Sequence, residues 1–464
     1  MKNVIKFLFL LSIVPSLFNA KENAQQTPKG YVLNSQSSVP SKYGRIHTDK
    51  QINFADKAIT NSTKKLRQAS LPSSYSSVES GYITSVKNQN PYGTCWAFAA
   101  SAASEASLIK NNGFDKNSIN LSELHLAYFT YNNSYDELGL LSGDSFTITS
   151  DSYLEYGGIN YNSMLSYARW TGPADEGKNT KYSYSNANKS FKATSTSDAY
   201  SLTEAHLKNC YIIDTSDISL MKQMILEYGA GDFGYYHDEN DRYFNDTYDS
   251  YCYVQSVNTS SNRFNWANHE VTVVGWDDNF SRTKFSSNSR PTNNGAWLVK
   301  NSWRSGWGDN GYFWLSYEDS STIAEPTAFY SFDSKNHYEK NYQYDGTSDF
   351  YAEYSDNEDQ GGYTGGGYMA NVFTAQENEN VGAVTFVSFD ENIKYEISVY
   401  DNVNNTPTSG KLVSQKSGVE TYAGFHTIEL DTIPTINKGN KFAVVVRLTS
   451  SSNASDSITL ACDE

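Results

Sequence analysis

The sequence predicts an α+β domain followed by a smaller domain made of β-strands. Three features indicate this: an alanine-rich helical segment, two strand-like segments downstream of it, and a series of short strand-like runs after residue 336. The chain has 464 residues, and at about 150 residues per domain this length favours two or three domains. Hydrophobic residues make up 38%, which is enough for packed cores.

The first 20 residues have the pattern of a signal peptide, with two lysines, an apolar run over 7–14 and a cleavage point after Ala20. The run is shorter than the ~20 residues that span a bilayer, and we find no other transmembrane stretch. An uncleaved N-terminal anchor is the alternative. Residues 21–70 are polar, and we expect a pro-segment or linker there.

Residues 95–109 (CWAFAASAASEASLI) contain neither Gly nor Pro and are rich in Ala, which predicts a helix. Gly93 and Thr94 precede it, where a turn and an N-cap are expected. Because the segment carries almost no charge, we expect the helix to be buried on most sides.

Two strands are expected further along the chain. His269–Trp276 (HEVTVVGW) and 296–300 (AWLVK) are rich in β-branched and aromatic residues. The polar run 278–294 between them contains Pro291 and predicts a loop or protruding hairpin.

After about residue 336 the composition changes again. Short β-branched or aromatic runs are separated by Gly, Pro, Asn and Ser, which predicts an all-β sandwich. These runs cover 381–389, 394–403, 424–430 and 441–448. The acidic run 351–360 (YAEYSDNEDQ) is interpreted as a solvated linker, with a calcium site as the alternative.

The charge balance excludes some functions. The chain has 36 Lys and Arg against 52 Asp and Glu, a net charge of −16, so a nucleic-acid partner is not expected. The four cysteines form no CxxC pair and the histidines lack metal-ligand spacing, so we expect no metal site. The cysteine chemistry described below also requires no organic cofactor. Whether Cys210 and Cys252 form a disulfide or stay buried thiols remains open.

The segment around Cys95 carries the chemistry. A Cys in the first turn of a helix is activated, because unpaired N–H groups and the helix dipole favour the thiolate. A thiolate that attacks a carbonyl needs a base, which His269 can supply, and Asn301 can hold that ring. Gln89, six residues before Cys95, can donate its amide to an oxyanion.

Several blocks, in the correct order, resemble the papain family of cysteine peptidases over about 71–335. The first is Y-G-T-C-W-A-F at 92–98. The others are Leu71–Pro72 followed by Val86–Gln89, Leu121–Glu123, Gly157–Gly158, and NSWRSGWGDNGY at 301–312. The resemblance implies a two-lobed fold with a helical left lobe and a β-rich right lobe.

The resemblance also implies roles for individual residues. Cys95 is the nucleophile, His269 the general acid/base, Asn301 its orienting partner and Gln89 part of the oxyanion hole. Substrate-binding positions come from the same match: Gly157 and Gly158 for the substrate backbone, Trp303 over the His–Asn pair, and Glu270.

Glu270 follows the implied catalytic His and, in the resembled fold, borders the S2 pocket. A carboxylate there would favour a basic P2 side chain; a local contact that points it away is the alternative. Two positions depart from the family pattern. Tyr92 stands where the family usually has a disulfide cysteine, so the wall of the cleft must be braced in another way. Arg304 replaces a Gly of the family pattern.

The tail resembles the lectin-like domain of a subgroup of these peptidases, such as clostridial cell-wall and surface cysteine proteases. The segments 421–430 (TYAGFHTIEL) and 438–446 (KGNKFAVVV) carry this match, and we expect the domain to span 340–464. A cell-surface or carbohydrate ligand is the partner that such a domain implies.

We therefore expect a secreted or cell-surface cysteine endopeptidase, made as a zymogen, that acts on proteins or peptides. A lysosome-like compartment is the alternative if the host is eukaryotic. A catalytically degenerate surface-binding protein or adhesin, acting through the β-sandwich, is the alternative function.

Overall fold

The computed structural model describes residues 4–7, 31–32, 71–132, 135–141, 153–238, 240, 242–255, 267–344, 351–353, 363–364, 366–453 and 457–462. The chain divides into two compact units, which are described separately. One unit comprises residues 34–135 and 146–335 and is called the α+β unit below. The other comprises residues 1–33, 136–145 and 336–464 and is called the β unit.

The helices of the α+β unit include the one expected around Cys95. Helix α1 (Cys95–Asn112) runs one turn past the expected end and stops at Gly113, whose φ of 73° is left-handed. Thr94 precedes it but makes no side-chain cap, because its hydroxyl bonds to Tyr184 instead. The other α-helices are α2 (Glu123–Tyr131), α3 (Asn160–Ala168), α4 (Asp198–Ser201) and α5 (Ile218–Tyr228). Short 3₁₀ turns are η2 (Thr180–Tyr182), η3 (Tyr184–Asn186), η5 (Arg282–Lys284) and η6 (Thr322–Ala324).

One mixed sheet runs through the α+β unit. Its order is β4 (Ala205–Ile213), β11 (Thr327–Ser334), β5 (Gly231–Tyr235), β8 (His269–Asp277), β9 (Ala296–Lys300), β10 (Tyr312–Ser316), β7 (Ser250–Tyr251) and β6 (Phe244–Asn245). Strand β3 (Ser74–Ser76) also pairs with β8. The two expected strands are thus β8 and β9, and the loop between them contains only η5.

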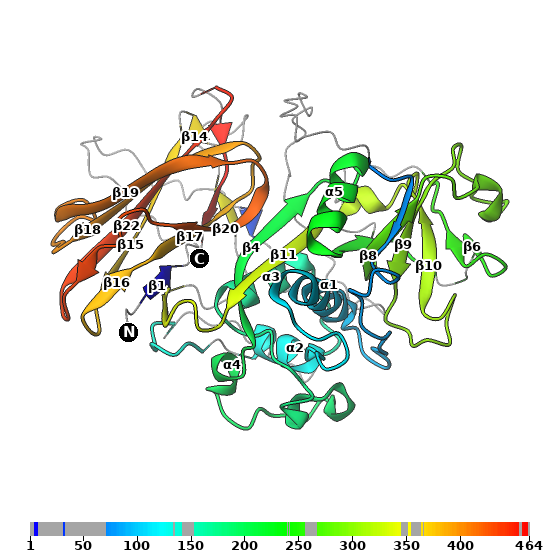
Figure 1. Cartoon of the computed structure of the whole chain (residues 1–464), viewed down its shortest axis with the longest axis horizontal. Coiled ribbons are helices and arrows are strands. Elements are labelled where there is room, and N and C mark those ends of the chain that lie inside the picture. Colours follow the sequence, from blue (N-terminus) through cyan, green and yellow to red (C-terminus); the bar gives the residue numbers. More distant parts are fainter. Residues whose placement is uncertain are drawn as a thin grey trace, which may run out of the picture. The chain divides into compact units, whose positions relative to one another are not determined.

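Helix α1 packs against β5, β8 and β11 (Figure 1). Its apolar and small side chains are buried almost throughout, as the uncharged sequence predicts. Strands β8 and β9 are antiparallel, with Thr272 opposite Lys300. The start of β8 and the end of β9 therefore lie at the same edge of the sheet.

The β unit consists of short strands, as expected. A four-stranded antiparallel sheet has the order β15 (Gly367–Thr374), β22 (Lys441–Ser450), β18 (Ile393–Asp401) and β19 (Lys411–Glu420). Strands β17 (Ala383–Ser388) and β20 (Ala423–Glu429) form an antiparallel pair. A second four-stranded sheet has the order β12 (Lys340–Tyr342), β1 (Val4–Phe7), β16 (Glu379–Val381) and β21 (Thr435–Ile436).

The remaining strands of the β unit are very short. Strand β13 (Tyr351–Glu353) pairs with β2 (Tyr31–Val32) and β24 (Leu460–Cys462), and β14 (Tyr363–Thr364) pairs with β23 (Ser457–Ile458). Strand β13 begins the acidic run considered for calcium, whose residues 354–360 lie outside the described residues. Strand β1 falls within the expected signal peptide, which stays a prediction.

Three cysteines of the described part are buried and form no disulfide: Cys95, Cys210 and Cys252. A Cys210–Cys252 disulfide is therefore not formed, and the buried-thiol alternative holds. Within the ranges given above, no helix is both long enough and apolar enough to cross a bilayer.

Candidate active site

Cys95 is the first residue of α1, and its side chain is fully buried. The first turn of the helix contains no acidic residue that would oppose a negative charge on sulfur. The unpaired N–H groups of this turn and the positive end of the helix dipole favour a thiolate at this position. The structure thus places Cys95 where a reactive thiol is expected.

His269 and Asn301 meet across the edge formed by β8 and β9. His269 Nε2 lies 2.8 Å from Asn301 Oδ1, and both side chains are buried. Asn301 Oδ1 also accepts a hydrogen bond from the backbone N–H of Ser302 at 2.7 Å. Because an amide oxygen only accepts, Nε2 carries the proton, and Nδ1 is the basic atom of the neutral ring.

Trp303 covers the His–Asn pair. Its ring stacks on the imidazole of His269 with a centroid distance of 4.5 Å and an interplanar angle of 17°. A face-stacked indole keeps water from the His269–Asn301 hydrogen bond and favours the positively charged imidazolium. Trp303 thus lies over the His269–Asn301 pair, and its role in the chemistry stays a prediction.

Gln89 is joined to the same segment through Ser302. Its Oε1 accepts from Ser302 Oγ at 2.6 Å, and its backbone N–H donates to Ser302 O at 2.8 Å. Its Nε2 donates to Tyr92 O at 3.0 Å. The amide has two N–H groups, so one is left for an oxyanion.

The loop that carries Gln89 is braced by Tyr184. The Tyr184 hydroxyl lies 2.7 Å from Gln89 O, to which it donates, and 2.6 Å from Thr94 Oγ1. Its ring packs edge-on against Phe98 of α1 at 4.7 Å. This contact holds the loop containing Tyr92, where the resembled family has a disulfide cysteine.

The two candidate glycines lie beside α1. A Cβ on Gly158 would lie 2.5 Å from the ring of Trp96, the residue after Cys95, so only glycine fits without rearrangement. Gly157 has a left-handed φ of 83°, and its carbonyl accepts from Tyr131 at 2.6 Å. The geometry explains Gly158 by packing and Gly157 by its left-handed backbone, and their contact with substrate stays a prediction.

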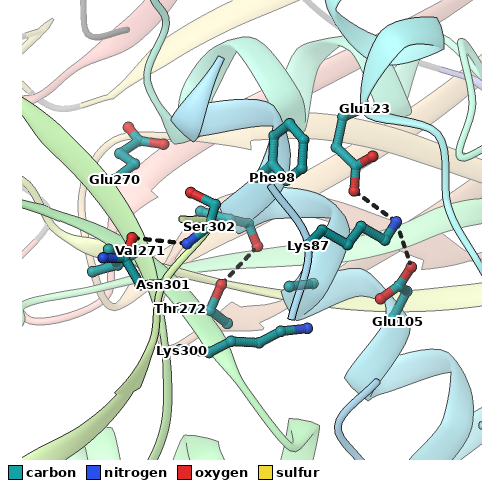
Figure 2. Close-up of a pocket in the computed structure, with 12 residues that line it drawn as sticks. Lys87, Phe98, Glu105, Glu123, Glu270, Val271, Thr272, Lys300, Asn301 and Ser302 are labelled. Carbon is teal, nitrogen blue, oxygen red and sulfur yellow. Dashed lines mark hydrogen bonds and ion pairs between the residues drawn. The ribbon is translucent and has the colours of Figure 1, made fainter. Parts of the chain in front are cut away.

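A buried ionic network, which the sequence did not reveal, ties the segments that carry Gln89 and Asn301 to α1. Lys87 Nζ donates to Glu123 Oε1 and to Leu121 O, both at 2.7 Å, and lies 3.3 Å from Glu105 Oε1 (Figure 2). Lys300, next to Asn301, reaches Thr84 Oγ1 at 3.1 Å, and Thr84 donates to Glu105 Oε2 at 2.5 Å. The one feature of the sequence that could have indicated this network is Glu105, the sole charged residue in the otherwise uncharged stretch 95–109.

Charges in this network are strongly perturbed. The cavity beside it holds about 10 Å³, room for roughly one water. Burial lowers the pKa of Lys300 to about 8 and raises that of Glu123 to about 7. Burial also opposes the charge of Lys87, but Glu105 and Glu123 outweigh it, so the pKa of Lys87 is raised and the lysine stays charged.

Glu270 lies in a separate group of buried acids. Its side chain is fully buried, and burial, followed by Glu325 and Asp232, raises its pKa well above the ordinary range. Figure 2 shows its carboxyl group turned away from the lysines of the ionic network. No set of three or more His, Cys, Asp or Glu residues in the described part has a metal-ligating arrangement. The structure thus gives Glu270 a local acidic contact, and its substrate-binding role stays a prediction.

We predict that Lys87→Met destabilises the fold by about 3 kcal/mol, because it leaves two buried carboxylates without their shared cation. Chemical denaturation at neutral pH measures this. The matched control is Lys178→Met, whose ion pair with Glu204 is formed by a lysine side chain that is 61% exposed. The control should cost less than about 1 kcal/mol, and equal losses in both variants would contradict the prediction.

Comparison with family models gives two matches. Residues 71–332 match the papain family of cysteine proteases, and residues 342–463 match a lectin-like domain. Among curated proteins, the chain is 28% identical over 265 residues to fruit bromelain of Ananas comosus, covering 55% of this chain and 57% of that protein. It is 27% identical over 260 residues to human cathepsin L2, covering 56% of this chain and 64% of that protein. The chain thus matches less than two thirds of the length of these relatives.

Two solved structures resemble most of the chain. One, the clostridial cysteine protease Cwp84 after propeptide cleavage, is 26% identical and covers 84% of this chain and 87% of its own, with a TM-score of 0.64. The other holds the cysteine protease and lectin-like domains of Cwp84, described as a surface layer associated protein of Clostridium difficile. It is 24% identical and covers 84% and 78%, again with a TM-score of 0.64. These matches confirm the predicted fold class and the predicted family resemblance.

Proposed function

Because the chain belongs to the papain family of cysteine proteases, we propose that it is a secreted endopeptidase that cleaves polypeptides through a thioester on Cys95. The observation that supports this mechanism best is the buried 2.8 Å contact between His269 and Asn301 at the sheet edge beside α1. Membership of this family supports the assignment as a cysteine peptidase, a hydrolase, and the roles of the individual residues are part of the proposal.

The reaction begins from an ion pair between a Cys95 thiolate and a His269 imidazolium. In the first half-reaction the thiolate sulfur attacks the peptide carbonyl carbon. The negative charge moves to the carbonyl oxygen, where the remaining N–H of Gln89 and the backbone N–H of Cys95 stabilise it. When the C–N bond breaks, imidazolium Nδ1 of His269 gives its proton to the leaving amine. The products are a Cys95 thioester and a free amine, and Asn301 holds the ring orientation throughout.

Hydrolysis of the thioester reverses the roles. Neutral His269 takes a proton from water through Nδ1, and the water oxygen bonds to the thioester carbon. The same N–H donors hold the second oxyanion. Collapse expels the Cys95 sulfur as a thiolate beside the imidazolium, so the initial ion pair is restored and no other reagent is consumed.

We predict that an epoxysuccinyl thiol inhibitor labels Cys95 alone in the reduced protein, with parallel loss of casein hydrolysis. Cys210 and Cys252 provide the internal control, because neither lies at the start of a helix (Cys210 is within β4 and Cys252 follows β7) and burial raises the pKa of each thiol. Mass spectrometry locates the label, and Cys95→Ala should lack both label and activity. A folded, pro-segment-free protein that takes up no label at Cys95 would favour the degenerate, surface-binding alternative.

We further propose that Glu270 selects a basic side chain at P2. Burial and the neighbouring Glu325, Asp232 and Cys95 all disfavour a negative charge on Glu270. A substrate cation would supply the missing compensation, so binding and ionisation of Glu270 would occur together.

We expect peptides with Arg at P2 to be cleaved faster than peptides with Leu, and Glu270→Gln to remove this preference. Values of kcat/KM for the paired peptides measure it. The Leu peptide serves as the control, because its rate should change little in the variant. Equal rates for Arg and Leu in the wild-type protein would rule the role out.

We also propose that residues 1–20 are removed on secretion, that residues 21–70 act as a pro-segment, and that the domain over 340–464 holds the enzyme at a cell surface. The similarity to Cwp84, described as surface layer associated, supports this location. The lectin-like match supports a cell-surface or carbohydrate ligand for the C-terminal domain.

For the surface role, the full-length Cys95→Ala protein should sediment with isolated cell walls as the unchanged chain does, because binding would not need the nucleophile. A soluble wall polysaccharide should release it if the ligand is carbohydrate. Cosedimentation assays with and without the polysaccharide measure both effects. Failure of either protein to sediment would argue against an anchoring role.

A further inference from the structure

His237 is a second histidine beside the catalytic pair, and no sequence motif marks it. It lies two residues beyond the end of β5, and only 3% of it is exposed. The centroid of its ring is 6.5 Å from that of His269. Because buried polar groups are normally hydrogen-bonded, specific contacts are expected to hold this ring so close to the implied acid/base group.

The backbone of His237 fixes the residue that precedes His269. Its N–H donates to Asn268 Oδ1 at 2.7 Å, and its carbonyl accepts from Asn268 Nδ2 at 3.0 Å. The Asn268 backbone N–H also donates to Tyr235 O at 3.1 Å. Three hydrogen bonds therefore hold Asn268, and with it the start of β8.

The ring of His237 supports the indole that covers His269. It meets Trp303 edge-to-face, with centroids 4.8 Å apart at 79°, while Trp303 stacks in parallel on His269. The His237 ring also stacks on the ring of Tyr251, with a centroid distance of 5.5 Å, and its Nδ1 lies 3.0 Å from the Tyr235 hydroxyl. Tyr235 in turn lies opposite His269 in the β5–β8 register.

We propose that His237 is a positioning residue that fixes the catalytic imidazole of His269, acting through Trp303 and Asn268. It touches neither substrate nor the reacting atoms. Without its ring, Trp303 loses its lateral support and the imidazole gains freedom to rotate away from Cys95. This inference rests on the proposed function, since it concerns the thiolate–imidazolium pair of that mechanism.

The test measures, as a function of pH, the rate at which iodoacetamide alkylates Cys95 in the mature protein, from which the proposed signal peptide and pro-segment (residues 1–70) have been removed. A thiolate paired with imidazolium reacts well below the ordinary thiol pKa of about 8.5, which gives a plateau of reactivity at acid pH. We expect His237→Ala to lower this plateau and kcat/KM by about tenfold to hundredfold. Above the thiol pKa its alkylation rate should equal that of the unchanged protein, because the thiolate then forms without its partner.

Two further variants separate positioning from folding. His237→Phe keeps a ring between Tyr251 and Trp303 and should restore most of the plateau. Asn268→Ala removes the brace but leaves the ring, and should lower the plateau as His237→Ala does. These variants keep the test decisive if His237→Ala alone fails to fold, which thermal unfolding would show.

The matched control is His206→Ala. His206 is also buried and stacks on a tryptophan, Trp170, at 3.6 Å and 9°, but it lies in β4 away from His269. We expect the alkylation plateau of His206→Ala at acid pH to equal that of the unchanged protein. A normal plateau in both His237→Ala and Asn268→Ala, or an equal loss at every pH, would overturn the positioning role. Absence of the plateau in the unchanged protein would instead overturn the proposed function, and the His237 inference with it.

Discussion

The hydrogen bond between His269 and Asn301 is the interaction on which the rest of the site depends. It forms because β8 and β9 are antiparallel, so the start of one strand meets the end of the other. Ser302 links this pair to Gln89. It donates its backbone N–H to Asn301 and its hydroxyl to Gln89, and its carbonyl accepts from the backbone of Gln89. The orientation of the His269–Asn301 pair and the position of the Gln89 amide are therefore linked through one residue, Ser302.

The ionic network holds the same segments by a different force. Lys87 lies two residues before Gln89, and Lys300 lies directly before Asn301. Both reach Glu105 on α1, Lys87 directly and Lys300 through Thr84. Charges in a buried, weakly polarisable setting interact strongly, but they are costly unless each is compensated. Such a network constrains geometry more than it adds stability, and here it constrains the distance from α1 to the catalytic loops.

Local sequence was enough to predict the elements that carry the chemistry. The stretch 95–109 predicted α1 to within one turn, and strand β9 was predicted with its observed ends. Strand β19 was missed because it lies at a sheet edge, where its largely exposed residues 411–420 show no apolar run. Strand β15 was missed because it begins at the end of a glycine-rich stretch.

The parts of the site that could not be predicted depend on contacts between distant residues. Lys87 and Glu123 are 36 positions apart, and His237 and Trp303 lie on separate segments of the chain. Nothing in the local pattern of either residue indicates its partner. The acidic surroundings of Glu270 were hidden for the same reason, because Asp232 and Glu325 come from different elements. Motifs name the reacting groups, but the groups that hold them in place are visible only in three dimensions.

The contacts that Tyr184 makes with the loop carrying Gln89 explain how the fold tolerates Tyr92 in place of a disulfide cysteine. Tyr184 ties Gln89 to Thr94, the residue before Cys95, because its hydroxyl donates to Gln89 O and accepts from Thr94 Oγ1. Its packing on Phe98 fixes that hydroxyl against the first turn of α1. A covalent bridge would make the loop sensitive to the reductant that keeps a nucleophilic cysteine in its thiol form. Because this brace contains no sulfur, the conditions that keep Cys95 reduced leave the position of Gln89 unchanged.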